Sequence, residues 1–342
     1  MTEQTSDLRV AVVGVGAMGA DHVRRLADRV VGARPVLVAD ASAQTAERVA
    51  AAHPGVRVAP DALAALDDDD VDAVVIASTG PTHAELLLAC LERGLPVLCE
   101  KPMTTDVASA LEVVRAEAAV SATTGKRLVQ VGFMRRYDAG YVALRQLVET
   151  DELGAPLLLH CAHRNASVPP YSTSETVVLD SLVHEVDGAR FLLGEEVTAI
   201  TVRTPRRRRS APEGLADPVF ALLETQSGAL VDVEVSAATG LGYEVRTELV
   251  AERGTALVGT ESGPLVARAD TAVRGRRVPA GFLERFEAAY DAEVQAWADA
   301  ARRGTAAGPS SYDGYAATAV TTAGVEALRT GRRVEVVLEP RP

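Results

Sequence analysis

A glycine-rich turn near the beginning of the chain constrains the fold more than any other sequence feature. The sequence Gly14-Val15-Gly16-Ala17-Met18-Gly19 follows directly after the apolar run Leu8–Val13. Such a run is typical of a parallel strand buried on both faces. Gly14 would permit a tight turn, Gly16 would let the backbone approach a pyrophosphate, and Gly19 would let a helix pack on the strand.

The segments after this turn alternate between short apolar runs and helical stretches. We expect strands at Pro35–Ala39, Ala73–Ala77, Pro96–Cys99 and Leu128–Val131, and helices at Ser42–Ala52, His83–Arg93 and Asp106–Val120. Strands that alternate with helices predict a parallel, doubly wound sheet. Because 342 residues exceed the usual size of one compact core, we also expect a second domain.

Asp40 indicates which dinucleotide this sheet would bind. It ends the second predicted strand, 21 residues after Gly19. An acidic residue at this place accepts hydrogen bonds from the adenosine ribose. Its carboxylate would repel a 2′-phosphate, and the neighbouring Ala41 and Ser42 supply no positive charge. The sequence therefore predicts a Rossmann domain over residues 1–132 that binds NAD rather than NADP.

After about residue 132 the pattern changes, because several strands follow one another without helices between them. We expect strands at Pro156–His163, Val197–Arg203, Val219–Thr225, Ala229–Ser236, Tyr243–Glu252, Thr255–Val258 and Arg333–Leu338, and helices at Ala139–Glu149, Leu179–Leu193, Phe282–Arg303 and Tyr312–Thr330. Consecutive strands favour an open, mostly antiparallel sheet. Residues 133–342 are therefore predicted to form a second α/β domain.

Two short sequences carry candidate catalytic groups. Glu100-Lys101-Pro102 stands at the carboxyl end of a predicted strand, where open α/β sheets bind ligands. Asp180 and His184 lie four residues apart in a predicted helix, so they would share one face. A histidine that titrates near neutral pH suits removal of a hydroxyl proton when a hydride passes from an alcohol to NAD. Taken alone, each sequence could equally be a surface feature.

Composition argues against several other functions. A net charge of −12 opposes broad binding to nucleic acid, and the basic run Arg206–Arg209 is expected in a solvated loop. No apolar stretch approaches the roughly 18 residues of a membrane span, and the first residues lack the pattern of a signal peptide, which predicts a cytoplasmic protein. Cys90, Cys99 and Cys161 lack metal-like or redox spacing, so we expect buried thiols and no metal site.

Several longer stretches resemble the glucose–fructose oxidoreductase and inositol dehydrogenase family, essentially from end to end. Besides the features above, the most specific stretches are Gly132–Asp138, His160–Asn165, Asp180–Asp187 and Ser311–Tyr315. The inositol dehydrogenases are the most similar members. The resemblance implies NAD-dependent oxidation of a ring hydroxyl of a cyclic polyol, with myo-inositol giving 2-keto-myo-inositol (scyllo-inosose). It also implies a second domain that binds substrate and mediates contacts in a homotetramer.

The resemblance assigns roles to individual residues. Lys101, Asp180 and His184 would form the catalytic triad, with His184 as proton acceptor and a cis bond between Lys101 and Pro102. The polyol site would contain Met134, Arg135, His163, Asp180, His184 and Tyr243. The cofactor site would contain Gly14, Gly16, Ala17, Met18, Gly19, Asp40, Ser78, Glu100 and Lys101. Judged by residue type alone, Arg135 would lie on the surface and Tyr243 in a sheet.

The resemblance leaves the preferred substrate open. Ala166–Tyr171 falls in a variable segment that we expect near the substrate. The scyllo- and D-chiro-inositols, an amino-cyclitol and glucose therefore remain alternative substrates. A non-catalytic NAD-binding regulator is a further alternative, although the joint presence of Lys101, Asp180 and His184 argues against it.

Overall fold

The computed structural model describes residues 7–209, 211–259, 266–268, 273–275 and 277–342. The chain forms two compact units, and each is assembled from separate parts of the sequence. The first comprises Met1–Met134, Tyr290–Thr318 and Glu339–Pro342, and the second comprises Arg135–Ala289 and Ala319–Leu338. The predicted division at residue 132 thus describes only the longest segment of the first unit, to which later helices add residues.

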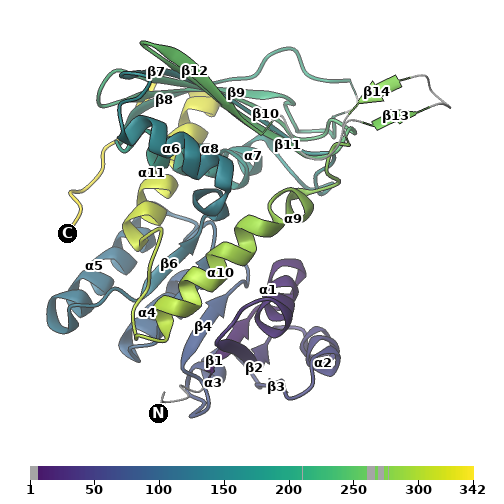
Figure 1. Ribbon diagram of the computed structural model, residues 1–342, viewed down its shortest axis with the longest axis vertical. Coiled ribbons are helices and arrows are strands. Elements are labelled where there is room, and N and C mark those ends of the chain that lie inside the picture. The colour runs from purple at the N-terminus through teal and green to yellow at the C-terminus, as the bar shows by residue number, and fades with distance from the viewer. Residues whose placement is uncertain (1–6, 210, 260–265, 269–272, 276) are drawn as a thin grey trace. The chain divides into compact units, whose positions relative to one another are not determined.

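The first unit is built on a six-stranded parallel sheet in the order β3-β2-β1-β4-β5-β6 (Figure 1). Its strands are β1 (Leu8–Val13), β2 (Ala33–Ala39), β3 (Arg57–Val58), β4 (Ala73–Ile76), β5 (Val97–Glu100) and β6 (Val129–Gly132). Its helices include α1 (Ala17–Asp28), α2 (Ala43–Ala52), α3 (Ala62–Leu66), α4 (His83–Glu92) and α5 (Val107–Thr124), with a 3-10 turn, η1 (Gly80–Thr82). The predicted doubly wound sheet is confirmed, and β3 and α3 are additions to the predicted elements.

Local side-chain chemistry explains where several of these helices begin and end. Ser42 accepts a hydrogen bond from the N–H of Thr45, as expected for the residue before α2. Asp106 accepts one from Ser109 at the start of α5, and Gly125 ends that helix with a φ of 70°. Only glycine adopts such a left-handed conformation at little cost, so this helix ends where its sequence dictates.

The carboxyl ends of the strands align along one edge of the sheet. Val13 lies beside Ile76, and Ile76 lies beside Cys99. The glycine turn, Ser78 and Lys101 follow these strand ends and therefore leave the sheet at the same edge. Because β1 and β4 are neighbours although β2 and β3 lie between them in sequence, this edge includes the switch point at which α/β sheets bind ligands.

One large core side chain of the first unit comes from near the C-terminus. Trp297 lies on α10 (Glu287–Ala301) and belongs to the same buried apolar cluster as Val10, Val38 and Leu98. Parallel strands are covered on both faces, so such a cluster collects apolar side chains from strands and helices alike. Residues near the end of the chain therefore help to form the core of the N-terminal sheet.

The second unit contains a seven-stranded sheet in the order β12-β11-β7-β10-β9-β8-β15. Its strands are β7 (Pro156–Arg164), β8 (Val197–Arg203), β9 (Val219–Thr225), β10 (Leu230–Ser236), β11 (Glu244–Ala251), β12 (Gly254–Val258) and β15 (Val334–Glu335), with β13 (Val266–Arg268) and β14 (Val273–Gly275) paired separately. Further elements are η2 (Met134–Tyr137), α6 (Ala139–Glu149), α7 (Ser174–Asp180), α8 (Leu182–Leu193), α9 (Phe282–Arg285) and α11 (Ser311–Thr330). Among the described strands of this sheet only β7 and β10 pair in parallel, so the mostly antiparallel sheet is confirmed.

One predicted helix is divided at a place that matters for the site. The segment Leu179–Leu193 forms α7 and α8 with a break at Ser181. The prediction that Asp180 and His184 lie in a single helix is therefore wrong, because Asp180 ends α7 and His184 lies in the first turn of α8. Aspartate and serine disfavour helix interiors because their side chains compete for backbone hydrogen bonds. The predicted helix near the C-terminus likewise divides, into α9 and α10.

The two faces of the seven-stranded sheet differ in character. Buried and partly exposed residues alternate strictly along β11. His163 of β7 lies opposite buried Val245 and therefore faces the covered side, on which α7 and α8 pack. On the other side, Arg164 pairs with Glu234 at 2.6 Å and with Glu244 at 3.1 Å. The alternation thus directs His163 inward and the charged side chains outward.

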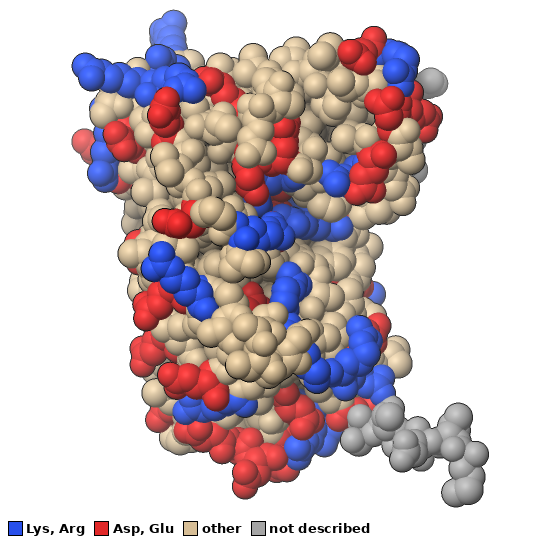
Figure 2. All heavy atoms as spheres, turned by 90° about the vertical axis from the view of Figure 1, so that its left-hand side faces the viewer, with Lys and Arg blue, Asp and Glu red and all other residues tan. Residues whose placement is uncertain are grey.

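The described part of the chain has no helix that is both long enough and apolar enough to cross a bilayer. Within the same residues, no three His, Cys, Asp or Glu side chains gather to bind a metal ion. Acidic and basic side chains are interspersed over the face drawn in Figure 2. The cysteines are buried free thiols, as expected, and burial raises the pKa of Cys90 to about 12.

Candidate active site

A cavity of about 580 Å³ lies at the carboxyl edge of the first unit's sheet. Four predicted cofactor residues line it, namely Gly14, Gly16, Asp40 and Ser78. They come from the ends of β1, β2 and β4, which are consecutive neighbours in the sheet. The sheet thus brings together residues that lie up to 64 positions apart in sequence (78 − 14).

Each glycine of the turn meets a different spatial requirement. Gly14 has a φ of +80°, and a Cβ there would lie 2.3 Å from the Cα of Ser78. A Cβ on Gly19 would lie 1.8 Å from the carbonyl oxygen of Gly14. In contrast, a Cβ on Gly16 would meet nothing within 4 Å. Gly14 and Gly19 therefore serve the packing of the turn, whereas Gly16 borders open space that a ligand can occupy.

The end of β1 and the start of α1 suit an anionic ligand with a ribose. Gly16 precedes α1 and offers no side chain to the first N–H groups of the helix. Such N–H groups carry partial positive charge and bind phosphate. The Asp40 carboxylate accepts the N–H groups of Val15 and Ser42, each at 2.8 Å, which fixes its position at the end of β2. The described residues therefore fit a dinucleotide with an unphosphorylated ribose.

Glu100 and Lys101 leave the same edge of the sheet, but neither is among the residues that line this cavity. The bond between Lys101 and Pro102 is cis, as the resemblance implies. The buried ring of His83 lies 2.9 Å from the carbonyl oxygen of Pro102 and 3.0 Å from that of Ser78. This histidine therefore connects the lysine segment to a segment that lines the cavity.

A buried polar cluster occupies the covered side of the second unit's sheet. Arg135 and Glu185 are 1% and 2% exposed, and the Arg135 Nη1 lies 2.5 Å from the Glu185 Oε1. The Nδ1 of buried His163 lies 3.2 Å from the same oxygen and 3.3 Å from the Arg135 Nη2. The prediction from residue type that Arg135 lies on the surface is wrong, because Glu185 compensates its charge in the interior.

Aromatic and imidazole rings surround this cluster. The ring of Tyr243, which directly precedes β11, lies 5.5 Å edge-to-face from that of His163. The His184 ring lies 6.2 Å from the His163 ring. The Arg135 guanidinium also lies 5.8 Å from the ring centre of Phe286. The structure therefore brings Arg135, His163, His184 and Tyr243 together, as the resemblance implies.

The remaining predicted site residues are divided between the two units. Met134 is buried in η2, in the first unit, together with Lys101. Asp180 and His184 belong to the second unit, on α7 and α8. Asp187, one turn after His184, pairs with Arg136 at 2.6 Å. The three predicted catalytic residues thus come from both units, and each unit carries part of the set.

The cluster shifts the ionisation of its members in opposite senses. Burial alone would raise the pKa of Glu185, but the Arg135 guanidinium and the hydrogen bond to His163 outweigh it and lower that pKa. Burial raises the pKa of Tyr243, an effect that nearby Arg135 partly opposes. Glu185 is therefore an anion at neutral pH, and the Tyr243 hydroxyl keeps its proton and can donate a hydrogen bond.

Glu185 is the residue that sequence reasoning missed. It lies between His184 and Asp187, in a stretch that carries the resemblance, yet no role was inferred for it. Its partners Arg135 and His163 are 50 and 22 residues away in sequence (185 − 135 and 185 − 163). The sequence could indicate Glu185 only indirectly. Once Arg135 is known to be buried, it requires a carboxylate from another element.

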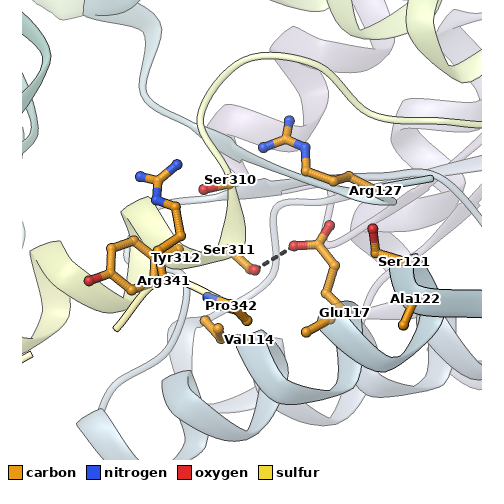
Figure 3. A pocket seen from close by; sticks show the side chains of 11 residues that line it. Val114, Glu117, Ser121, Ala122, Arg127, Ser310, Ser311, Tyr312, Arg341 and Pro342 are labelled. Carbon is orange, nitrogen blue, oxygen red and sulfur yellow. Dashed lines mark hydrogen bonds between the residues drawn. The ribbon is translucent and has the colours of Figure 1, made fainter. Parts of the chain in front are cut away.

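A second cavity, of about 360 Å³, lies in the first unit between α5 and the start of α11 (Figure 3). The Glu117 carboxylate on its wall accepts the N–H groups of Leu128 at 3.0 Å and Val129 at 2.7 Å. It also accepts the hydroxyl of Ser311, drawn as a dashed line in Figure 3. Because the chain itself satisfies this carboxylate, we interpret it as a connection between α5, β6 and α11.

Comparisons with known proteins agree with both halves of this description. Residues 8–133 match the family described as "Oxidoreductase family, NAD-binding Rossmann fold", and residues 141–257 match the "GFO/IDH/MocA C-terminal domain". Inositol 2-dehydrogenase of Mycolicibacterium smegmatis is 52% identical over 343 residues, which cover 98% of each protein. Inositol 2-dehydrogenase of Streptomyces avermitilis is 53% identical over 335 residues, which cover 98% of this chain and 96% of that protein.

A solved structure extends the likeness to three dimensions. The crystal structure of myo-inositol dehydrogenase from Lactobacillus casei, in complex with NAD(H) and myo-inositol, matches with a TM-score of 0.93. It is 34% identical in sequence, and the match covers 98% of each chain. The chain therefore belongs to the GFO/IDH/MocA family of oxidoreductases, and its first domain is that family's NAD-binding Rossmann domain.

Proposed function

We propose that the protein is an NAD-dependent inositol 2-dehydrogenase that oxidises myo-inositol to 2-keto-myo-inositol (scyllo-inosose). The observation that carries this proposal is the buried cluster of Arg135, His163 and Tyr243 beside His184. A cyclitol carries a ring of hydroxyls, each of which needs a partner once it leaves water. The names of the relatives at 52% and 53% identity support the same substrate.

The cofactor assignments extend this proposal to residues of the first domain, residues 1–132. We assign NAD contacts to Gly14, Gly16, Ala17, Met18, Gly19, Asp40, Ser78, Glu100 and Lys101. The open space beside Gly16 and the fixed carboxylate of Asp40 support the assignment. Bound NAD supplies the acceptor for the hydride that leaves the substrate carbon.

The catalytic roles follow from the chemistry of three side chains. His184 accepts the proton of the reacting hydroxyl as the C–O bond becomes a carbonyl. Lys101 donates a hydrogen bond to the same oxygen. Asp180 stabilises the imidazolium that His184 becomes. His184 thus takes the proton, as a histidine can near neutral pH. Lys101 supplies the hydrogen bond and Asp180 the compensating charge.

The substrate contacts come from residues assigned to the second domain, 133–342. We assign hydroxyl contacts to Arg135, His163 and Tyr243, together with Asp180 and His184, and an apolar contact to Met134. Among the described residues, the buried Nε of Arg135 has no hydrogen-bond partner. A buried donor of this kind is costly when left unpaired, and a substrate hydroxyl would satisfy it.

A substrate panel tests the function. Reduction of NAD is measured with myo-, scyllo- and D-chiro-inositol, an amino-cyclitol and glucose. We expect the highest kcat/KM with myo-inositol. A preference for another member of the panel would replace the substrate but keep the chemistry. No activity with any of them would favour a non-catalytic NAD-binding regulator.

A single variant tests the assigned base. His184→Ala should lower kcat by roughly 10²-fold or more, the usual contribution of a general base, while the Kd for NAD stays unchanged. Calorimetric titration with NAD provides the second measurement. Unchanged turnover would remove His184 from its assigned role.

We also propose a cytoplasmic homotetramer that acts in myo-inositol catabolism. The outward face of the seven-stranded sheet supports the assembly, because it carries Phe220, which is 39% exposed, beside partly exposed Leu222. Light scattering on the purified protein measures the mass. Phe220→Asp should weaken the assembly, whereas a monomeric wild type would contradict the tetramer.

A further inference from the structure

Two buried titratable side chains lie directly behind the lysine segment of the first unit. His22 on α1 is 0% exposed, and Glu100 at the end of β5 is 7% exposed. The His22 Nε2 lies 2.8 Å from the Glu100 Oε1. The two residues are 78 positions apart in sequence, so the fold alone creates this pair. The mechanism proposed above uses Lys101 and gives no role to His22.

The second oxygen of Glu100 is also engaged. Its Oε2 accepts the backbone N–H of Lys101 at 3.3 Å. A Cβ on Gly132 of β6 would lie 3.1 Å from the same oxygen, so the glycine leaves room for the carboxylate. On the other side of Lys101, the carbonyl of Pro102 contacts His83. The backbone is therefore restrained on both sides of the lysine.

The elements around this pair carry other charged and titratable groups, including Glu293 on α10, which is 0% exposed and lies one turn after Tyr290. On α1, Arg25 pairs with Asp21 at 2.6 Å and also with Asp291 on α10. The ring of Tyr290 on α10 lies 6.5 Å edge-to-face from that of His22. The neighbouring Cys99 on β5 has its pKa raised by burial, so it stays a neutral thiol.

The geometry indicates which ring nitrogen of His22 carries the proton. A carboxylate in the interior needs hydrogen-bond donors. A neutral imidazole with its proton on Nε2 supplies such a donor and leaves Nδ1 as a lone pair. Among the described residues Nδ1 has no hydrogen-bond partner, so a proton there would be a buried, unpaired donor.

We propose that His22 is a positioning residue, which fixes the ionised Glu100 carboxylate so that Glu100 in turn orients the backbone of Lys101. The inference rests on the proposed function only in the role given to Lys101. Removing the His22 donor should change how well the lysine is presented, while Gly14, Gly16 and Asp40, which line the dinucleotide cavity, keep their places.

Three variants of the full-length protein test the proposal. His22→Leu removes the donor, His22→Gln can place an amide N–H near the position of Nε2, and Glu100→Gln removes the charge. For His22→Leu we expect kcat to fall roughly 10- to 100-fold, as for small misplacements of catalytic groups. The Kd for NAD should rise far less, because Glu100 and Lys101 are only two of the nine residues assigned to the cofactor. His22→Gln should restore most of kcat, because its amide N–H can donate to the same Glu100 oxygen.

A double-mutant cycle and a matched control separate this role from simple packing. In a Glu100→Gln background, His22→Leu should add little further loss, since the group that it holds no longer ionises. His83→Leu removes another buried histidine that contacts the same turn but not Glu100, so its loss of kcat should be the same in the wild-type and Glu100→Gln backgrounds. An equal loss for His22→Leu in the two backgrounds, or no rescue by His22→Gln, would overturn the proposal.

One measurement does not depend on activity. Nitrogen-15 spectra of the imidazole rings, assigned with His22→Gln, should show His22 as the Nε2–H tautomer. In Glu100→Gln this preference should weaken. A protonated or Nδ1–H ring in the wild type would overturn the proposal even if the enzyme oxidises inositol. Failure of the substrate panel with the expected tautomer would instead count against the proposed function alone.

Discussion

The cofactor cavity of the first unit and the polar cluster of the second are built on opposite principles. The cavity uses backbone N–H groups, glycines and one carboxylate that two neighbouring N–H groups fix. The cluster uses long side chains from η2, β7 and α8 that satisfy one another in the interior. In the cavity, backbone N–H groups at the start of α1 remain available to a ligand. The cluster depends on every member, so losing one exposes the charge of another.

The largest effect should come from breaking the cluster. Glu185→Ala leaves the Arg135 guanidinium buried without a counter-charge, and we expect about 3–5 kcal/mol of lost stability, as for other buried pairs. Urea unfolding followed by circular dichroism measures it. The matched control is Glu224→Ala, which removes a partly exposed partner of Arg333 and should cost far less, as for other surface ion pairs. Similar losses in both variants would mean that burial does not distinguish the two pairs.

The same carboxylate predicts how stability depends on pH. The pKa of Glu185 is lower in the folded protein than its ordinary value of 4.5. Its contribution is therefore fully present above pH 4.5 and is lost as the pH falls through the lower folded value. The free energy of unfolding should fall more steeply below that pH in the wild type than in Glu185→Gln. Parallel curves would contradict the lowered pKa.

A smaller effect is expected from the cofactor cavity. Asp40→Ala removes a charged acceptor from the ribose site, and the Kd for NAD should rise roughly 10- to 100-fold, as for hydrogen bonds to charged groups. Binding of NADP should not weaken in parallel, because the repulsion of a 2′-phosphate disappears. Calorimetry with both cofactors measures the two changes. An unchanged Kd for NAD would separate Asp40 from the ribose.

The smallest effect should come from one hydroxyl beside the cluster. Tyr243→Phe loses a single proposed hydrogen bond to substrate, which should lower kcat/KM roughly 5-fold, mostly through KM. The control is Tyr141→Phe, whose buried hydroxyl contacts Thr247 at 3.0 Å. That variant should lose stability and keep its KM. A change of KM in both would indicate that the cluster moves as a whole.

The first unit could be predicted in detail because its signals are local. The glycine turn, the apolar strands and the Ser42 cap each act over a few residues, and together they specify the sheet and its cavity. Asp40 could be assigned because its distance from the glycine turn follows from the βαβ unit itself. The short β3 and α3 were missed because two and five residues carry little periodicity.

The second unit could be predicted only in part, because its site depends on contacts between distant segments. The resemblance implied Arg135, His163, His184 and Tyr243, and the structure brings them together. It gave no sign of Glu185, whose importance is apparent only once the arginine is seen to be buried. The break at Ser181 was missed as well, because apolar periodicity continues across it.

The place of Trp297 in the first unit has a consequence for synthesis on the ribosome. When residues 1–134 have left the exit tunnel, all six parallel strands are available, but Trp297 and the neighbouring Ala298 and Ala301 of their apolar cluster are not. Part of the core of the nascent segment 1–134 therefore stays unfilled until α10 has also left the tunnel. Truncation before α10 should give a chain that binds chaperones rather than a free-standing dinucleotide-binding domain.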